Sequence, residues 1–137
     1  MLFRSGAISW RSSKQTIVAT STMEAEFIAC YEATTQALWL RNFIGGLKIV
    51  DSIARPIKIF CDNRVAIFFS KNNKSGSRSK HIDIKYLRVR ENIKRNEVFI
   101  EHIRTELMIA DPMTKGLPVK QFKSHVEHMG LIDSYCI

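Results

Sequence analysis

Hydrophobic residues between Ser21 and about Gly46 recur at the three- and four-residue spacing of one face of an α-helix. They fall at positions 29, 30, 33, 37, 40 and 44, and the pair Gly45-Gly46 is expected to end the helix. Ser21 and Glu24 have the spacing of a capping box, in which the glutamate reaches back to the N–H of the capping residue. The pattern therefore predicts one long helix, with Glu24 as part of its cap.

Shorter patterns on either side of this helix predict further elements. Residues 7–10 and 16–19 are short apolar runs around the polar stretch RSSKQ, which is typical of two strands that could form a hairpin. Ile57–Cys61 follows a proline and is rich in β-branched and aromatic residues, so we expect a buried strand there. The remaining expected elements are a helix over residues 64–71, a basic helix over about 82–95, a strand over 98–103, a short helix near 110–115 and a final helix over about 118–129. Strands that alternate with helices indicate an α/β fold.

The composition is that of a single globular domain over residues 1–137, with 45% hydrophobic and 25% charged residues. No apolar run reaches the ~18 residues that a membrane span needs, and the first residues lack the pattern of a signal peptide. Three cysteines far apart favour free thiols in a reducing cytoplasmic or nuclear compartment over a disulfide framework. Cys30 and Cys61 also fit the role of small buried hydrophobic residues.

The positive charge is concentrated in one segment. The chain carries a formal charge of +8, and residues 71–95 hold nine basic residues against two acidic ones, a net charge of +7. The basic residues are Lys71, Lys74, Arg78, Lys80, Lys85, Arg88, Arg90, Lys94 and Arg95. Clustered basic side chains favour a polyanionic partner such as a nucleic acid, because they release counterions from phosphates. The alternative is a solvated helix face.

Glu26 has no part in the helix cap. At about 100° per residue its side chain points about 200° away from that of Glu24, so it heads the apolar stripe of the long helix. An ionised carboxylate that faces a core is costly unless a partner or a metal ion compensates it. The alternative is a glutamate at the rim of the helix, where its charge suits the helix dipole.

Two further acidic residues occupy comparable positions. Asp62 directly follows the expected strand Ile57–Cys61, and ligands of open α/β sheets gather beyond the carboxyl ends of parallel strands. Asp111 precedes Pro112 near the expected short helix. Each of these aspartates could instead cap a helix. Together with Glu26, they suggest a carboxylate cluster for a hard divalent cation such as Mg²⁺, which prefers oxygen ligands.

Four stretches, in this order, resemble a known family: GAISWRSSKQTIVATSTMEAEFIACYEATTQALWLR, IKIFCDNRVAI, SRSKHIDIKYLRVRENI and EHIRTELMIADPMTKGLP. The chain is similar over nearly its whole length to the ribonuclease H domain of copia-type LTR retrotransposon Pol polyproteins. This resemblance implies a ribonuclease H-like mixed sheet with flanking helices. It also implies a hydrolase that cuts the RNA strand of RNA–DNA hybrids with two Mg²⁺ ions about 4 Å apart.

The resemblance also assigns roles to individual residues. Glu26, Asp62 and Asp111 match the carboxylates that hold the metal ions. His102 resembles the histidine that assists metal or product turnover, and its alternative is an ordinary surface histidine. The residues expected to contact the backbone of the hybrid are Lys80, His81, Lys85, Arg88 and Arg90.

One departure from the family concerns its first catalytic aspartate, which lies on the first, central strand of the sheet. Residues 1–23 contain no Asp or Glu, and Leu2-Phe3 resembles only the end of the family's second strand. We therefore expect a truncated domain that lacks its first strand, binds Mg²⁺ weakly and is inactive as a nuclease. The alternatives are a non-catalytic basic nucleic-acid-binding module and a fragment whose unpaired strand edges associate with another Pol chain.

Overall fold

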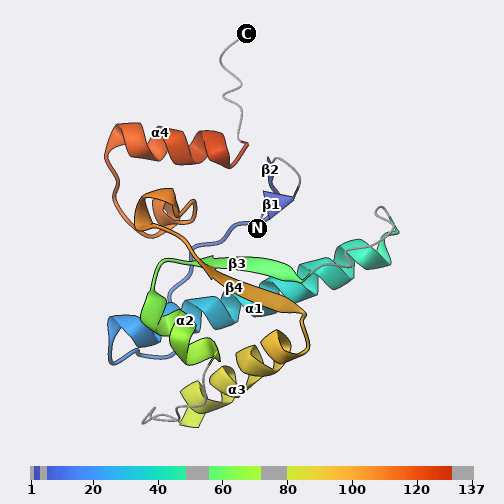
Figure 1. Ribbon diagram of the computed structural model, residues 1–137. Coiled ribbons are helices and arrows are strands. Elements are labelled where there is room, and N and C mark those ends of the chain that lie inside the picture. Colours follow the sequence, from blue (N-terminus) through green and yellow to red (C-terminus); the bar gives the residue numbers. More distant parts are fainter. Residues whose placement is uncertain (1, 4–5, 49–55, 72–79, 131–137) are drawn as a thin grey trace. The chain divides into compact units, whose positions relative to one another are not determined.

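The computed structural model of the chain describes residues 2–3, 6–48, 56–71 and 80–130 (Figure 1). The chain divides into two compact units. Unit 1 consists of Met1–Lys14 and Ile103–Ile137, and unit 2 consists of Gln15–His102. Unit 2 contains the hydrophobic core cluster and two of the three acidic residues predicted as metal ligands.

The long predicted helix is confirmed as α1, Thr22–Gly46. Ser21 is its N-cap, and its hydroxyl oxygen accepts a hydrogen bond from the backbone N–H of Glu24 at 3.1 Å. The Glu24 carboxylate departs from the capping-box expectation, because it accepts hydrogen bonds from the hydroxyl and the backbone N–H of Thr20, one residue before the cap. These two bonds, the hydroxyl bond first, lower the pKa of Glu24. Local polar contacts therefore fix the start of α1.

The buried stripe of α1 differs from the predicted one. Its buried residues are Phe27, Ile28, Cys30, Thr34, Ala37 and Leu40. Ala29 and Ala33 are exposed, so the prediction that both face the core is wrong. Thr34 takes a core position despite its polarity, because its hydroxyl donates a hydrogen bond to the Cys30 carbonyl at 2.7 Å. The buried stripe thus runs through Cys30, Thr34 and Ala37 at helical spacing. Ala29 and Ala33 each lie one position before a buried residue of this stripe.

Two parallel strands form the sheet of unit 2. They are β3, Ile57–Cys61, and β4, Val98–His102, which confirm both predicted strands to within one residue. In their register Cys61 lies beside His102, so the carboxyl ends of the two strands are level. The crossover between the strands carries α2 and α3, as a parallel connection requires.

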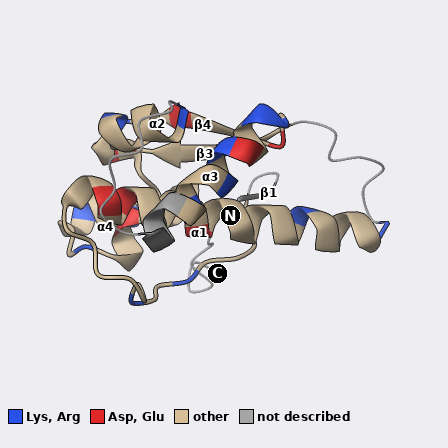
Figure 2. Cartoon of the chain, turned by 90° about the horizontal axis from the view of Figure 1, so that it is seen from below, with Lys and Arg blue, Asp and Glu red and all other residues tan. Residues whose placement is uncertain are grey.

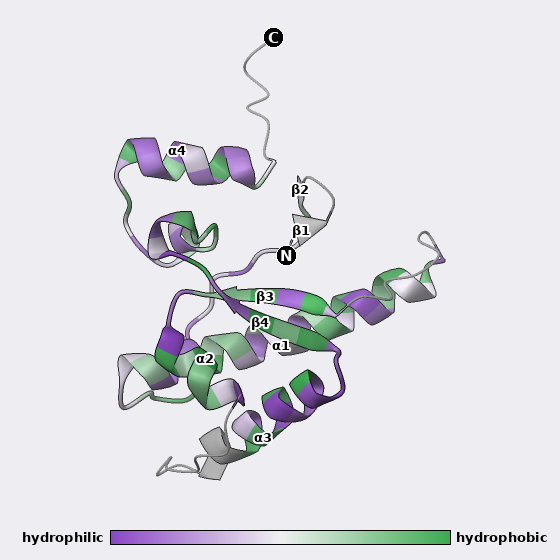
Figure 3. Ribbon diagram, viewed as in Figure 1, coloured by the Kyte–Doolittle hydropathy of each residue, from purple (hydrophilic) through white to green (hydrophobic). Residues whose placement is uncertain are grey.

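The two faces of this sheet differ in exposure. Cys61, Val98 and Ile100 are buried with at most 2% of their surface exposed, whereas Phe60 and Phe99 are 47% and 46% exposed. This alternation is expected for strands covered on one face, since successive side chains point to opposite sides. The outer face also carries an ion pair between Lys58 and Glu101 at 2.8 Å, and β3 accordingly shows a hydrophilic segment between hydrophobic ones in Figure 3.

Helices α2, Arg64–Lys71, and α3, Lys80–Lys94, complete the core of unit 2. The buried cluster draws on all three helices and both strands: Phe27, Ile28, Cys30, Cys61, Ala66, Ile67, Tyr86, Val89, Val98 and Ile100. On α3, Tyr86 and Val89 are buried and Ile93 packs against the same cluster, whereas the side chain of Ile82 lies outside the described residues. The three helices therefore share the inner face of the sheet.

Helices and parallel strands thus alternate in unit 2, as predicted for an α/β fold. In the part of the chain that the structure describes, no helix is both long enough and apolar enough to pass through a membrane.

The predicted hairpin between residues 7–10 and 16–19 is wrong. The strand pair in this region is β1, Leu2–Phe3, with β2, Gly6–Ala7, in antiparallel register. Residues 16–19 alternate between exposed and half-buried positions as a strand would, but they form no ladder with another described segment. Ile17 and Ala19 instead pack against the core cluster as an irregular segment.

The remainder of unit 1 contains two 3₁₀ helices, η1, Thr105–Leu107, and η2, Asp111–Met113, followed by α4, Val119–His128. They correspond to the predicted short and final helices, apart from η1, which was not predicted. The backbone N–H of Ala7 donates a hydrogen bond to the Met129 carbonyl at 2.7 Å. This bond joins the first and last segments of unit 1.

Ile100 tests the assignment of the two sheet faces. Its side chain is 0% exposed, so Ile100→Ala should lower the free energy of unfolding by about 2–5 kcal/mol through lost burial and a cavity. Urea denaturation followed by circular dichroism measures the loss. The matched control is Phe99→Ala on the outer face, for which we expect a smaller loss of about 1 kcal/mol, because the ring is 46% exposed and contacts the Lys71 ammonium. Equal losses for the two variants would contradict this assignment.

Candidate metal centre

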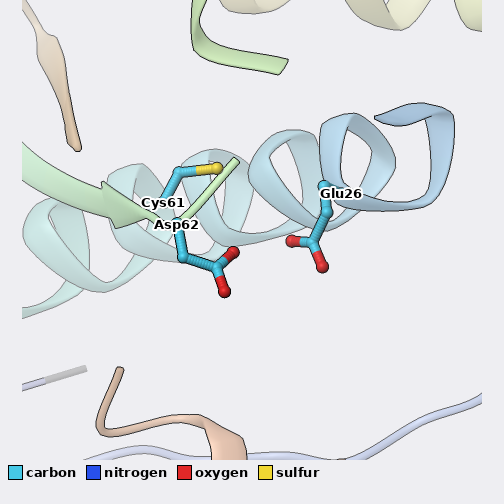
Figure 4. A group of neighbouring side chains, drawn as sticks. All are labelled: Glu26, Cys61 and Asp62. Atoms are coloured by element: carbon cyan, nitrogen blue, oxygen red, sulfur yellow. The ribbon is translucent and has the colours of Figure 1, made fainter. Parts of the chain in front are cut away.

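Two of the predicted acidic ligands meet at the carboxyl end of β3. Glu26 lies in the second turn of α1, and Asp62 is the first residue after the strand. Their carboxylates point toward one another in Figure 4. One oxygen of Glu26, one oxygen of Asp62 and the Cys61 sulfur all lie within 4.8 Å of one another. Both acids are half-buried, so the site adjoins the core on one side and solvent on the other.

Neither acid caps a helix, although capping was an alternative for Asp62. Asn63 performs that role for α2, since its Oδ1 accepts hydrogen bonds from the backbone N–H groups of Val65 and Ala66, both at 3.0 Å. Ser21 performs it for α1. Ser21 and Asn63 thus satisfy the helix ends, so neither end requires the carboxylate of Glu26 or Asp62 as a cap.

Cys61 is a member of this cluster that sequence reasoning missed as a ligand. The signal was present in the sequence, because Cys61 directly precedes Asp62 and a second thiol, Cys30, follows Glu26 by one helical turn. Both thiols are free and buried. The pKa of Cys30 is raised by its hydrogen bond with the Cys61 thiol, then by burial and by the negative charges of Cys61 and the two acids.

His102 shares the strand-end position of the acid pair. It is the last residue of β4 and lies beside Cys61 in the parallel register. Its side chain is exposed. The backbone therefore brings His102 to the same edge of the sheet as Asp62.

Asp111 belongs to unit 1, whereas Glu26 and Asp62 belong to unit 2. Within unit 1 Asp111 is the first residue of η2 and is only 6% exposed. Its Oδ1 lies 3.2 Å from the Lys115 Nζ. A buried carboxylate with a cation beside it is compensated locally. The convergence of Asp111 with the acid pair stays a prediction.

Helix α3, whose basic residues are blue in Figure 2, uses some of its charge to pack against α1. The Lys85 Nζ lies 2.8 Å from a carboxylate oxygen of Glu32 and 4.0 Å from the centre of the Tyr31 ring. Arg88 donates a hydrogen bond to the Tyr31 hydroxyl at 3.5 Å. Lys85 is therefore mainly a packing residue, because its side chain is only 17% exposed.

The other basic residues predicted to contact nucleic acid differ in exposure. Arg88 is exposed and Arg90 is half-buried, whereas the side chains of Lys80 and His81 lie outside the described residues. Arg88 also lines a pocket of about 310 Å³ between α1 and α3. The full lining is Thr35, Leu38, Arg88, Glu91, Asn92 and Arg95. Cationic and polar groups thus gather where the two helices meet.

The relatives of this chain are Pol polyproteins of retrotransposons. It is 36% identical over 129 residues to the Pol polyprotein from transposon TNT 1-94 of Nicotiana tabacum, a match that covers 94% of this chain and 10% of that protein. It is 32% identical over 124 residues to that from transposon RE1 of Arabidopsis thaliana, covering 90% of this chain and 8% of the relative. The Ty1-NL2 Gag-Pol polyprotein of Saccharomyces cerevisiae is 32% identical over 125 residues, with 89% and 7% covered.

The chain therefore spans a tenth or less of the length of these relatives. No family model matches it. No solved structure matches it either. The comparisons thus agree with the resemblance to retrotransposon Pol polyproteins seen in the sequence.

Tyr31 provides a pH-dependent test of the contact between α1 and α3. Its pKa is lowered, mainly by the hydrogen bond from Arg88. We expect Arg88→Ala to return the Tyr31 pKa toward about 10. Titration of the tyrosine ring signals by NMR measures this change, with Tyr31→Phe to assign the signal. Because folding favours the phenolate, the associated gain in stability is present above the unfolded pKa of about 10 and is lost as the pH falls through the folded value.

Arg95→Ala is the control for this titration, since the Arg95 guanidinium pairs with Glu91 rather than with Tyr31. A Tyr31 pKa that moves equally in both variants would contradict a specific contact with Arg88.

Proposed function

We propose that this chain is part of the ribonuclease H domain of a retrotransposon Pol polyprotein. The parent domain would hydrolyse the RNA strand of RNA–DNA hybrids with the help of two divalent cations. The observation that carries the proposal is the pair Glu26 and Asp62, two carboxylates from separate elements that face each other at the end of a parallel strand. The similarity to retrotransposon Pol polyproteins over about nine-tenths of the chain supports it.

The donor set fits the proposed cation. Glu26 and Asp62 offer carboxylate oxygens, which are the ligands that Mg²⁺ prefers. Both are half-buried, so their charge is less screened by water than at an open surface and attracts a cation more strongly. When bound, Mg²⁺ ions in such sites activate a water molecule and stabilise the leaving oxygen of a phosphodiester. Asp111 is the third proposed ligand.

His102 and the basic helix have supporting roles in this proposal. His102 lies at the same strand end as Asp62 and would assist metal or product turnover at that edge. Exposed Arg88 would contact the phosphate backbone of the hybrid. Lys85 would act indirectly, by holding α3 against α1.

The carboxylates offered by this chain are fewer than the four of the family it resembles. With three candidate acids, Mg²⁺ binding should be weak, because each missing ligand removes attraction while the remaining like charges still repel. We therefore expect the 137-residue chain by itself to bind divalent cations at the acid pair without efficient cleavage.

A metal titration tests the proposed centre. Mn²⁺ added to the isotope-labelled chain should broaden the NMR signals of Glu26, Asp62 and their neighbours, because it binds oxygen ligands and is paramagnetic. For Asp62→Asn, the same broadening should require an Mn²⁺ concentration about tenfold higher. Glu24→Gln is the matched control, since Glu24 is occupied by Thr20. Broadening that is centred elsewhere, or equal in both variants, would refute the centre.

The same protein should be incubated with Mg²⁺ and a labelled RNA–DNA hybrid. We expect little or no cleavage. Strong cleavage that is lost in Asp62→Asn would show that three acids suffice, and the expectation of an inactive chain would then be wrong.

A second candidate function is nucleic-acid binding without catalysis. It is favoured by the net charge of +7 on residues 71–95 and by the exposed cations of α3. This function needs no metal ion, because phosphate contacts alone supply non-specific affinity.

Salt dependence tests the basic surface. The affinity of the chain for an RNA–DNA hybrid should fall steeply between low and moderate salt, and Arg88→Ala should reduce the slope of log K against log salt by about one. Fluorescence anisotropy measures both quantities. Lys123→Ala on α4 is the control, and its slope should equal that of the unchanged chain. An affinity that does not change with salt would exclude phosphate contacts.

A further inference from the structure

We propose that Glu26, Cys61 and Asp62 form a binding site for a thiophilic divalent cation, with Zn²⁺ as the best-fitting ion. The potential ligand atoms of the first three residues lie within 4.8 Å of one another. They come from the second turn of α1 and from the end of β3, so two rigid elements hold them together.

The spacing suits a tetrahedral ion. Zn²⁺ binds sulfur at about 2.3 Å and carboxylate oxygen at about 2.0–2.2 Å, which places the ligands of a tetrahedron about 3.3–3.8 Å apart. Separations of up to 4.8 Å therefore shorten by about 1.0–1.5 Å at most when the ion binds. Rotation of the Glu26 and Asp62 side chains is sufficient for this, because both are only half-buried.

Cys30 lies on the same face of α1 as Glu26 but outside the group of ligand atoms that lie within 4.8 Å of one another. It follows Glu26 by four residues, so the two side chains lie one above the other on the helix. The Cys61 thiol donates a hydrogen bond to the Asn63 carbonyl at 3.6 Å, and metal binding would replace this bond. One sulfur and two oxygen ligands would then hold the ion, with a water molecule as the fourth ligand. Binding would release the proton of the Cys61 thiol to the solvent, since the thiolate is the form that coordinates a metal.

The inference shares Glu26 and Asp62 with the proposed magnesium centre and in that respect rests on the proposed function. It differs in the class of cation, because Mg²⁺ takes oxygen ligands whereas thiolates select softer ions. An ion held by Cys61 would occupy the carboxylates that Mg²⁺ requires. Zn²⁺ should therefore exclude Mg²⁺ from the acid pair.

Cobalt absorption tests the site on a Cys136→Ser background. Cys30 and Cys61 are then the only thiols in the chain, which has three cysteines. Co²⁺ added to this protein should produce a near-ultraviolet thiolate-to-cobalt charge-transfer band, and excess Zn²⁺ should remove it. Cys61→Ser should abolish the band, and Glu26→Gln should weaken Co²⁺ binding at least ~10-fold. Glu24→Gln is the control that should leave the band unchanged.

A measurement without substitutions in the core covers the case in which Cys61→Ser does not fold. Zinc K-edge X-ray absorption of the same Cys136→Ser protein with one equivalent of Zn²⁺ should show sulfur among the ligands. A shell of nitrogen and oxygen alone, or the absence of a cobalt band, would overturn the proposal. Broadening by Mn²⁺ at Asp62 would still report on the magnesium centre, so each proposal can fail independently.

Discussion

The packing of α1 against the carboxyl end of β3 is the constraint on which the candidate site depends. Phe27, Cys30 and Cys61 belong to one buried cluster, and this cluster fixes the helix and the strand relative to each other. Glu26 and Asp62 are each adjacent in sequence to a member of that cluster. Two like charges about 4 Å apart repel by about 1 kcal/mol in water and about 4 kcal/mol at an effective dielectric constant of 20. The apolar packing therefore holds in place two groups that would otherwise separate.

The helix ends of α1 and α2 are capped by residues other than Glu26 and Asp62. Ser21 and Asn63 supply the hydrogen-bond acceptors that the first turns of α1 and α2 require. Glu24 accepts its bonds from Thr20, also at the start of α1. If Asp62 capped α2, its oxygens would point along the helix axis rather than toward Glu26. The division of roles between neighbouring polar residues thus decides which carboxylates can act as ligands.

Periodicity predicted the elements of unit 2 well, because α1, β3, α2, α3 and β4 each bury a regular set of apolar side chains. Periodicity gave wrong predictions where a polar interaction or a contact between distant segments decides the structure. Thr34 occupies a core position because its hydroxyl is satisfied by the Cys30 carbonyl, and a pattern of apolar residues alone does not include such a position. Residues 16–19 alternate like a strand, but a strand also requires a neighbouring strand to pair with. The sequence of one segment does not show whether such a neighbour exists.

The sequence predicted the acidic residues Glu26 and Asp62 of the candidate site but not Cys61. Glu26 and Asp62 were found because a charge beside an apolar face is a visible anomaly. Cys61 was overlooked because a cysteine in an apolar strand fits the core equally well. The same reasoning limits what net charge can show about α3. The +7 of residues 71–95 includes Lys85, whose ammonium group is committed to Glu32 and Tyr31, so the charge available to a phosphate is smaller than the sequence suggests.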